Sequence, residues 1–489
     1  MASHPKPQLK SHPNIVANIG IVGVALVATL AMNQLAMILL ARILGPDDFG
    51  IYAVCLVFIN LLALVSVFGL DSAVIHRQTD TDKAIETAST LRFLLSLLLA
   101  VLLFVLAPLI ADMVGNQKLV TPLQVSSIAI VVAAFGFETS VRLSKDLLFK
   151  SVSMTRLANT AVWSVAALAL AYLGLGFWAL LFACIAGFAA TAVTLWIILP
   201  WKIPHKIDSV IARELVRYAV FPLGVGILGF LVWNVDKLAV GAILGSSALL
   251  GSYYIAFSYG TIIPNLFTGV TLTVMFPTFS KTQTDLAGLR ETYLKALKYL
   301  SHISIPAGVG LAVVSQTFVL GVLGSDWSDA VAPLEVFSIV GILGSLTSPA
   351  ASVFLATGNP DKMFRQTLVT ALIYFVFLVP AIFYGELVGV AALFLVAAIV
   401  SLVWVLFMVA EILRFTLADE LRMLIVPAAA SAIMAVLTFG VGILMGSTMQ
   451  SLGIQISVAI LAYSVCVILM TKGEIVREMK GLLASARSR

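Results

Sequence analysis

Long apolar runs alternate with short polar turns along almost the whole chain. A helix needs about 20 mostly apolar residues to cross the hydrocarbon core of a bilayer. The pattern therefore predicts an all-α integral membrane protein with fourteen transmembrane helices. The predicted spans are 15–41, 50–75, 86–114, 121–148, 155–174, 177–199, 210–243, 250–280, 288–322, 331–356, 363–384, 387–412, 422–446 and 452–471.

The pattern of the first half returns in the second half. ILGPDDFGIYAV at 43–54 matches ILGSSALLGSYYIA at 243–256, with one or two extra residues in the second turn. A second match pairs the stretch from Leu147 with the stretch from Phe354. Chance likeness between apolar segments is the alternative, but order and spacing agree twice. Parallel repeats around a site in mid-membrane are a recurring plan of transporters.

The repeat predicts two pseudo-repeated six-helix lobes followed by two further helices. The expected boundaries are an N-terminal tail at 1–14, an N-lobe at 15–199, a linker at 200–209, a C-lobe at 210–415, the last two helices in 416–471 and a C-terminal tail at 472–489.

Composition and charge support a membrane protein and orient it. Hydrophobic residues make up 61% of the chain and charged residues only 11%, whereas soluble domains carry about 25% charged residues. Of the 29 Lys and Arg residues, all but Arg42, Lys118 and Lys237 fall at the chain ends or near the even-numbered loops. Because cytoplasmic loops carry the excess of Lys and Arg, we expect both termini in the cytoplasm.

Several polar side chains lie inside the predicted spans, where they are costly and therefore usually face protein or water. They are Asn33, Gln34, Asp71, Glu138, Arg142, Asn234, Asp236 and Lys237, with Arg42 at the end of the first span.

Each of these residues also has a purely structural interpretation. Arg42 can extend its head to the outer lipid headgroups. Glu138 and Arg142 are four residues apart and can form an ordinary ion pair on one helix face. Asp236 and Lys237 are neighbours that point about 100° apart on a helix, so we expect no direct pair and at least one side chain facing an aqueous interior.

Chemistry that would indicate an enzyme is missing from the sequence. It contains no G-x-x-x-x-G-K-[ST] phosphate loop, no H-E-x-x-H and no Cys/His metal cluster. The three cysteines, Cys55, Cys184 and Cys466, lie far apart within apolar runs and are interpreted as small buried hydrophobic residues. We therefore expect a non-enzymatic protein without a cofactor or metal, and without a nucleic-acid partner.

The motifs resemble those of a known family. They are LARILGPDDFGIYA at 40–53, FINLLALVSVFGLDSAVI at 58–75, LGLGFWALL at 173–181, DKLAVGAILG at 236–245, GSYYIA at 251–256 and FPTFS at 276–280. Together they resemble the Wzx-type polysaccharide flippases of the multidrug/oligosaccharidyl-lipid/polysaccharide superfamily. The likeness covers essentially the whole chain, although Asp71 departs from a usually serine-rich segment.

The resemblance implies a flippase in the bacterial inner membrane. Its substrate would be an undecaprenyl-diphosphate-linked oligosaccharide, moved by alternating access from the cytoplasmic to the outer leaflet for O-antigen, capsule or exopolysaccharide synthesis. Membrane lipids, a polysaccharide polymerase and other assembly proteins would be its partners. The alternatives are a cation-coupled drug or metabolite antiporter of the same superfamily and a membrane polysaccharide polymerase.

The resemblance also implies a cationic cavity between the lobes. Arg42, Arg142 and Lys237 are the candidates for binding the diphosphate. The amides of Asn33, Gln34, Asn60 and Asn234 are the candidates for polar walls around the sugar. Asp71, Glu138 and Asp236 are candidates for coupling to protons or sodium.

Overall fold

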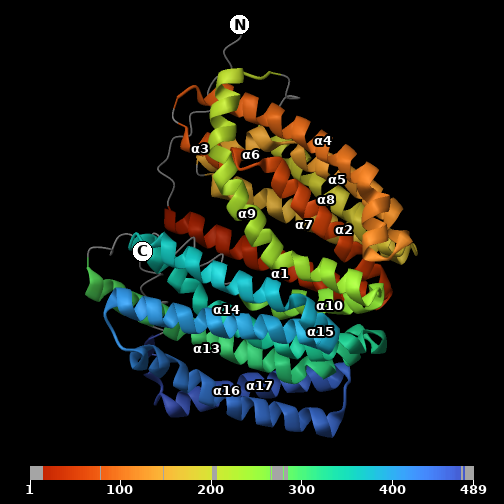
Figure 1. Ribbon diagram of the computed structural model, residues 1–489. Helices are drawn as coiled ribbons and strands as arrows, with labels where there is room; N and C mark the ends of the chain where they lie inside the picture. Colours follow the sequence, from red (N-terminus) through yellow and green to blue (C-terminus); the bar gives the residue numbers. More distant parts are fainter. Residues whose placement is uncertain are drawn as a thin grey trace.

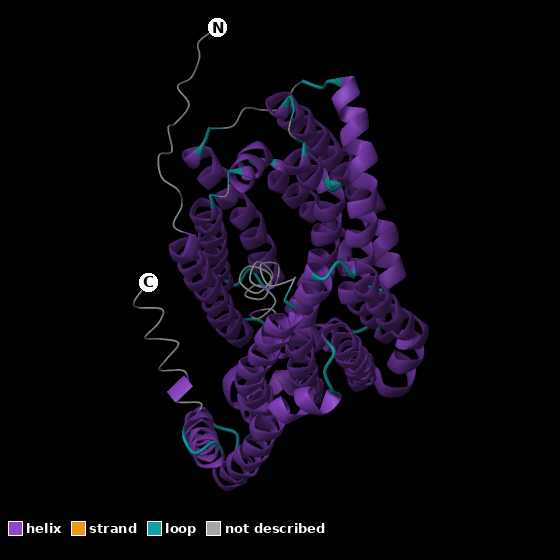
Figure 2. Cartoon of the chain, turned by 90° about the vertical axis from the view of Figure 1, so that its left-hand side faces the viewer, coloured by secondary structure: helices purple, strands orange, loops and turns teal. Residues whose placement is uncertain are grey.

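The computed structural model describes residues 15–77, 79–146, 148–200, 206–264, 266, 279, 285–474, 477 and 478. This part of the chain is helical and has no strand, and short loops join its helices (Figure 2). The predicted tail at 1–14, half of the linker, most of the C-terminal tail and the end of the span at 250–280 lie outside the described residues.

The first half of the chain forms the upper bundle of Figure 1. Its helices are α1 (Ile15–Ile43), α2 (Pro46–Val67), α3 (Leu70–His76), α4 (Thr81–Val114), α5 (Val120–Ala134), α6 (Phe137–Lys145), α7 (Phe149–Tyr172) and α8 (Phe177–Ile198), with the 3-10 turn η1 (Gln117–Leu119) before α5.

The second half forms the lower bundle and its blue edge (Figure 1). Its elements are α9 (Ser209–Leu244), α10 (Ser247–Gly260), α13 (Leu286–Phe318), η3 (Val319–Leu323), η4 (Ser325–Ala330), α14 (Val331–Ala356), α15 (Pro360–Leu413), α16 (Leu417–Met445) and α17 (Met449–Met470).

The described helices make this an all-α integral membrane protein. Eleven of them are long and apolar enough to cross a bilayer. Large apolar side chains such as Val105, Val436 and Leu444 are exposed on the outside of the bundle, as expected where lipid is the solvent. The helix α15 is broken at Glu386 (φ 47°, ψ −131°), which agrees with the predicted turn between two spans. The exact count of fourteen and the orientation of the termini stay predictions.

Two predicted spans are each two helices instead of one. The span at 50–75 breaks at Phe68 and Gly69, and the span at 121–148 breaks at Phe135 and Gly136. Gly69 (φ 66°) and Gly136 (φ 80°) both take the left-handed backbone conformation, which glycine adopts without steric cost. The breaks place the short helices α3 and α6 after the longer ones.

The helix α9 joins the two bundles. Its first turns pack through Ile211, Leu215 and Ala219 against a buried cluster from α3, α4 and α6. Its other end packs against α10 and α15, after a helix-internal proline at Pro222. The long helix thus crosses from the upper bundle to the lower one (Figure 1).

The two halves meet most closely where the repeated hairpin turns lie. We call this the outer end, because the charge distribution predicts that it faces outward. A Cβ atom on Gly50 would stand 1.9 Å from the Ser247 carbonyl oxygen, and one on Gly251 would stand 1.9 Å from the Pro46 carbonyl oxygen. One shift in sequence relates Pro46 to Ser247 and Gly50 to Gly251, so the contact between α2 and α10 is reciprocal.

This crossing predicts that Gly251→Ala destabilises the protein, because backbone atoms rather than a flexible side chain occupy the space that the methyl group needs. Overpacking of this kind typically costs about 1–3 kcal/mol. The melting temperature of the purified full-length protein in detergent should fall. The control is Gly229→Ala on α9, where an added Cβ meets nothing within 4 Å. Equal melting temperatures for the two variants would contradict the close crossing.

Candidate functional site

Arg42 closes the outer end of the molecule. Its Nη2 donates to the Gly321 carbonyl oxygen at 2.7 Å, and its Nε donates to the carbonyl oxygen of Val322. Trp327 strengthens the same closure, because its Nε1 donates to the Ala41 carbonyl oxygen at 3.0 Å. Arg42 therefore ties α1 to η3, and its guanidinium is already engaged in this conformation.

Asp236 and Lys237 form a direct ion pair, so the expectation that these neighbours do not pair is wrong. Lys237 Nζ lies 3.3 Å from Asp236 Oδ2 and donates to the Trp233 carbonyl oxygen at 2.8 Å. The ammonium also lies 3.9 Å from the centroid of the Phe257 ring, a favourable cation–π position. The long lysine side chain folds back along its own helix, which the angle between the two Cβ directions does not reveal.

Tyr253 completes this buried cluster by donating to Asp236 Oδ2 at 2.6 Å. Asp236 is fully buried and only 4% of Lys237 is exposed. The pair lies on α9 against α10. Its charges balance each other inside the protein, which is the arrangement that a buried charge requires.

Arg142 and Glu138 form the ion pair that their spacing allows, at 3.1 Å. Arg142 Nη1 also donates to Asp82 at 2.6 Å, and Lys145 on the same short helix donates to the Arg77 carbonyl oxygen at 2.7 Å. These contacts fasten α6 to the end of α3 and to the start of α4. Asp71 has a local role as well, because its Oδ1 accepts from the Ser72 backbone N–H at 2.7 Å in the first turn of α3.

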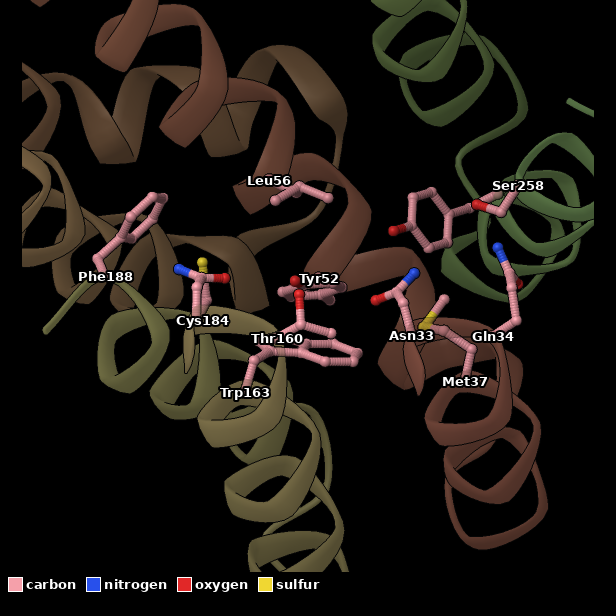
Figure 3. Close-up of a pocket in the computed structure, with 12 residues that line it drawn as sticks. Asn33, Gln34, Met37, Tyr52, Leu56, Thr160, Trp163, Cys184, Phe188 and Ser258 are labelled. Atoms are coloured by element: carbon pink, nitrogen blue, oxygen red, sulfur yellow. The ribbon is translucent and has the colours of Figure 1, made fainter. Parts of the chain in front are cut away.

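A cavity of about 300 Å³ lies between the two halves, and Figure 3 shows its lining. This volume is at the small end of the range for ligand sites. Its walls come from α1, α2, α7, α8 and α10. The lining residues are Asn33, Gln34, Met37, Tyr52, Leu56, Asn159, Thr160, Trp163, Cys184, Phe188, Tyr254 and Ser258.

Two of the predicted amides line this cavity. Asn33 and Gln34 lie on α1 opposite Ser258 and beside Met37 (Figure 3). The Oε1 atom of Gln34 is buried without a hydrogen-bond partner. A buried acceptor left unpaired costs about 1–3 kcal/mol, so this atom is poised to accept a hydrogen bond from a ligand or a water molecule.

The other two amides lie outside this lining set. Asn60 is exposed on α2, one helical turn beyond the lining residue Leu56. Asn234 donates to the Phe230 carbonyl oxygen at 3.0 Å within α9. The structure therefore brings Asn33 and Gln34 together in the cavity lining. Asn60 lies on the same face of α2 as the lining residue Leu56, and Asn234 hydrogen-bonds within its own helix.

Aromatic residues dominate the part of the cavity that sequence reasoning missed. Tyr52 on α2 and Tyr254 on α10 stand edge to face with their ring centroids 6.4 Å apart, and Trp163 lies across from Asn33 (Figure 3). Tyr52 follows Gly50 by two residues, and Tyr254 follows Gly251 by three. The shift that relates Gly50 to Gly251 sets Tyr52 against Tyr253, and Tyr254 is the next residue. The repeated turn therefore points to this aromatic stretch in both halves but not to Tyr254 itself.

Comparison with known proteins assigns the family. Residues 39–332 match the model of the family described as "Polysaccharide biosynthesis protein". The chain belongs to this family. It is 27% identical over 389 residues to the lipopolysaccharide biosynthesis protein WzxC of Escherichia coli (strain K12), covering 77% of each chain. It is 25% identical over 406 residues to the teichuronic acid biosynthesis protein TuaB of Bacillus subtilis (strain 168), covering 82% of this chain and 84% of the relative.

The fold agrees with that assignment. The structure of the lipid II flippase MurJ in an inward closed conformation superposes with a TM-score of 0.73 at 16% identity, covering 93% of this chain and 99% of MurJ. The family member described here is thus a multi-pass membrane protein with a flippase-type fold. The sequence-based resemblance to polysaccharide flippases is confirmed.

The buried pair on α9 predicts a non-additive response to mutation. Lys237→Met should destabilise the protein strongly, because it leaves Asp236 buried without a counter-charge, a loss of about 3–5 kcal/mol in comparable sites. The double variant Asp236→Asn/Lys237→Met should recover much of this loss, and thermal unfolding of the four proteins measures the coupling. Strictly additive shifts in melting temperature would show that the two side chains do not interact.

Proposed function

We propose that this protein flips an undecaprenyl-diphosphate-linked oligosaccharide from the cytoplasmic to the outer leaflet of the bacterial inner membrane. The product would serve the synthesis of a surface polysaccharide. Family membership supports the class of function. The carrying observation is a cavity walled by amides and aromatic rings that lies between the two halves, below an outer end that the same two halves close.

This arrangement supports alternating access. The N-lobe (15–199) and the C-lobe (210–415) would rock about the cavity, with 416–471 moving beside the C-lobe. In the conformation described here, the crossing of α2 and α10 and the hydrogen bonds of Arg42 hold the outer end shut. To open the outer end, the protein has to separate α2 from α10 and break the hydrogen bonds of Arg42. Arg42 would then be free to face the cavity and pair with an anionic substrate.

The cavity lining suits a sugar. Amide groups from Asn33 and Gln34 exchange hydrogen bonds with hydroxyl groups, and the faces of Tyr52, Trp163 and Tyr254 cover the apolar faces of a pyranose ring. Ligand sites commonly combine an apolar or aromatic wall with a few convergent polar groups. Asn60 would extend the polar wall along α2.

The membrane potential can drive the transport. A diphosphate carries about two negative charges, and moving one charge through 100 mV is worth about 2.3 kcal/mol. An inside-negative potential therefore pushes the anionic substrate outward. Coupling to an ion would use Asp71, Glu138 or Asp236, and the tight pair of Asp236 with Lys237 makes that carboxylate the most strongly tied of the three.

The proposal predicts where the substrate accumulates when the protein is missing. A deletion strain should hold its lipid-linked oligosaccharide in the cytoplasmic leaflet. The measurement is glycosidase accessibility in inside-out and right-side-out inner-membrane vesicles. Unpolymerised units in the outer leaflet would point to a polymerase. Normal lipid-linked sugar together with a loss of drug efflux would point to an antiporter.

The cavity can be tested with matched tryptophan variants. Trp163→Ala removes an aromatic wall of the cavity, whereas Trp196→Ala removes a tryptophan that is 53% exposed on the outside of α8. At equal protein levels in the membrane, Trp163→Ala should reduce surface polysaccharide about tenfold or more, and Trp196→Ala should leave it unchanged. Gln34→Leu should also reduce export without lowering the melting temperature, because it removes an unpaired buried acceptor. Full export by both Trp163→Ala and Gln34→Leu would exclude this cavity as the sugar site.

A further inference from the structure

A second cavity, of about 530 Å³, continues from the first one inside the upper bundle. The two cavities share Asn159, Thr160 and Phe188 in their linings. The second one lies among α1, α2, α4, α7, α8 and the break between α5 and α6. We call it the arginine chamber, after its two lining cations, Arg92 and Arg156.

Arg92 carries a guanidinium group that the protein leaves partly unsatisfied. Its Nη2 donates to the Ala133 carbonyl oxygen at 2.7 Å, and its central carbon lies 4.8 Å from the centroid of the Phe137 ring. Its Nε is buried and has no hydrogen-bond partner. Within the described residues Arg92 forms no ion pair.

Arg156 adds a second positive charge to the same chamber. It is exposed on α7, and in the described part of the chain it has neither an ion pair nor a hydrogen bond. Arg42 donates to two carbonyl oxygens and Arg142 to two carboxylates, whereas within the described residues Arg92 donates to a single carbonyl oxygen.

Four other polar side chains of the chamber are already hydrogen-bonded within the protein. The hydroxyls of Thr29, Thr155 and Thr191 donate to carbonyl oxygens of their own helices at 2.8, 2.7 and 3.1 Å. Asn159 Nδ2 donates to Thr191 Oγ1 at 3.1 Å. The guanidinium groups are the charged donors of the lining, beside the hydroxyls of Ser140 and Thr160, and their planar forks match phosphate oxygens.

The arginine chamber also lies near the end of the molecule where a substrate would enter from the cytoplasmic leaflet. Arg92 is eleven residues into α4 and Arg156 is seven residues into α7, or about 16 Å and 10 Å from the starts of those helices at 1.5 Å per residue. Both helices start at the end that the charge distribution predicts to be cytoplasmic. The amide-and-aromatic cavity lies beyond it, toward the outer end.

We propose that the arginine chamber binds the diphosphate of the lipid-linked substrate while the sugar occupies the cavity between the halves. This rests on the proposed function and assigns its anion subsite to Arg92 and Arg156, within one bundle. Diphosphate binding would give the buried Nε of Arg92 the acceptor that it lacks, since a buried donor without a partner is costly. The shared residues Asn159, Thr160 and Phe188 place the linkage between diphosphate and sugar where the two cavities join.

The test measures binding of undecaprenyl diphosphate to the full-length protein in nanodiscs of neutral lipid, with undecaprenol as the uncharged probe. The wild type should bind the diphosphate and not the alcohol. Arg92→Gln and Arg156→Gln should each weaken binding about tenfold to hundredfold, the usual effect of losing a hydrogen bond to a charged group. The control is Arg217→Gln on the exposed side of α9, which should bind as the wild type does.

A second measurement separates binding from folding. Arg92→Met should keep about the wild-type melting temperature without ligand, because the lost hydrogen bond to Ala133 is offset by the removal of a buried Nε that has no partner. Undecaprenyl diphosphate should then raise the melting temperature of the wild type but not of this variant. Arg92→Lys should bind undecaprenyl diphosphate with intermediate affinity, because lysine keeps the positive charge but lacks the planar, two-pronged set of donors of the guanidinium group.

Each outcome has a distinct meaning. If the wild type binds no undecaprenyl diphosphate, the proposed function itself fails. If the wild type binds and the double variant Arg92→Gln/Arg156→Gln binds equally well, only the arginine chamber is overturned. If phosphatidylglycerol competes as well as the diphosphate does, the chamber is a general site for anionic lipid headgroups and the diphosphate assignment is wrong.

Discussion

The backbone contact between α2 and α10 is the constraint on which the rest of the structure depends. Helices can approach this closely only where neither carries a side chain at the crossing, and Gly50 and Gly251 provide that on both sides. The contact is reciprocal, since each glycine faces the first turn of the other helix. Asn116 reinforces it by donating to Ser247 Oγ at 2.8 Å. Below the crossing, Tyr52 and Tyr254 form the roof of the central cavity.

Charges inside the bundle fall into two groups with different physical roles. Arg42, Arg142 and Lys237 are fully engaged by carbonyl oxygens or carboxylates, so in this conformation they hold helices together. Arg92 and Arg156 line a chamber and form no ion pair in the described structure, and Arg92 has one hydrogen bond, to the Ala133 carbonyl oxygen. Residue type alone cannot distinguish the two groups, because the difference lies in which groups from distant helices come within reach.

The sequence predicts the helical membrane fold and the family well, because apolar run length and turn residues are local signals. It also identifies Asn33 and Gln34, since amides inside an apolar span are conspicuous. It misses the breaks at Gly69 and Gly136, where apolar residues continue on both sides of the glycine. It also misses Arg92. Because the predicted span starts at residue 86, only six residues before Arg92, this arginine is interpreted as an ordinary charge at the cytoplasmic end of a helix. The pairing of Asp236 with Lys237 depends on a long side chain folding back and on Tyr253, neither of which spacing can show.

We propose that the crossing of α2 and α10 is a gate that opens when the opposite end closes. Spin labels at positions 47 and 326 would report the outer end, and labels at positions 80 and 411 the inner end, since all four native residues, Asp47, Asp326, Asp80 and Glu411, are exposed. Pulsed electron–electron distance measurements in lipid vesicles should give a short outer distance without substrate. With lipid-linked oligosaccharide, a longer outer component should appear together with a shorter inner one. An outer distance that stays fixed in both conditions, or two ends that widen together, would contradict the account.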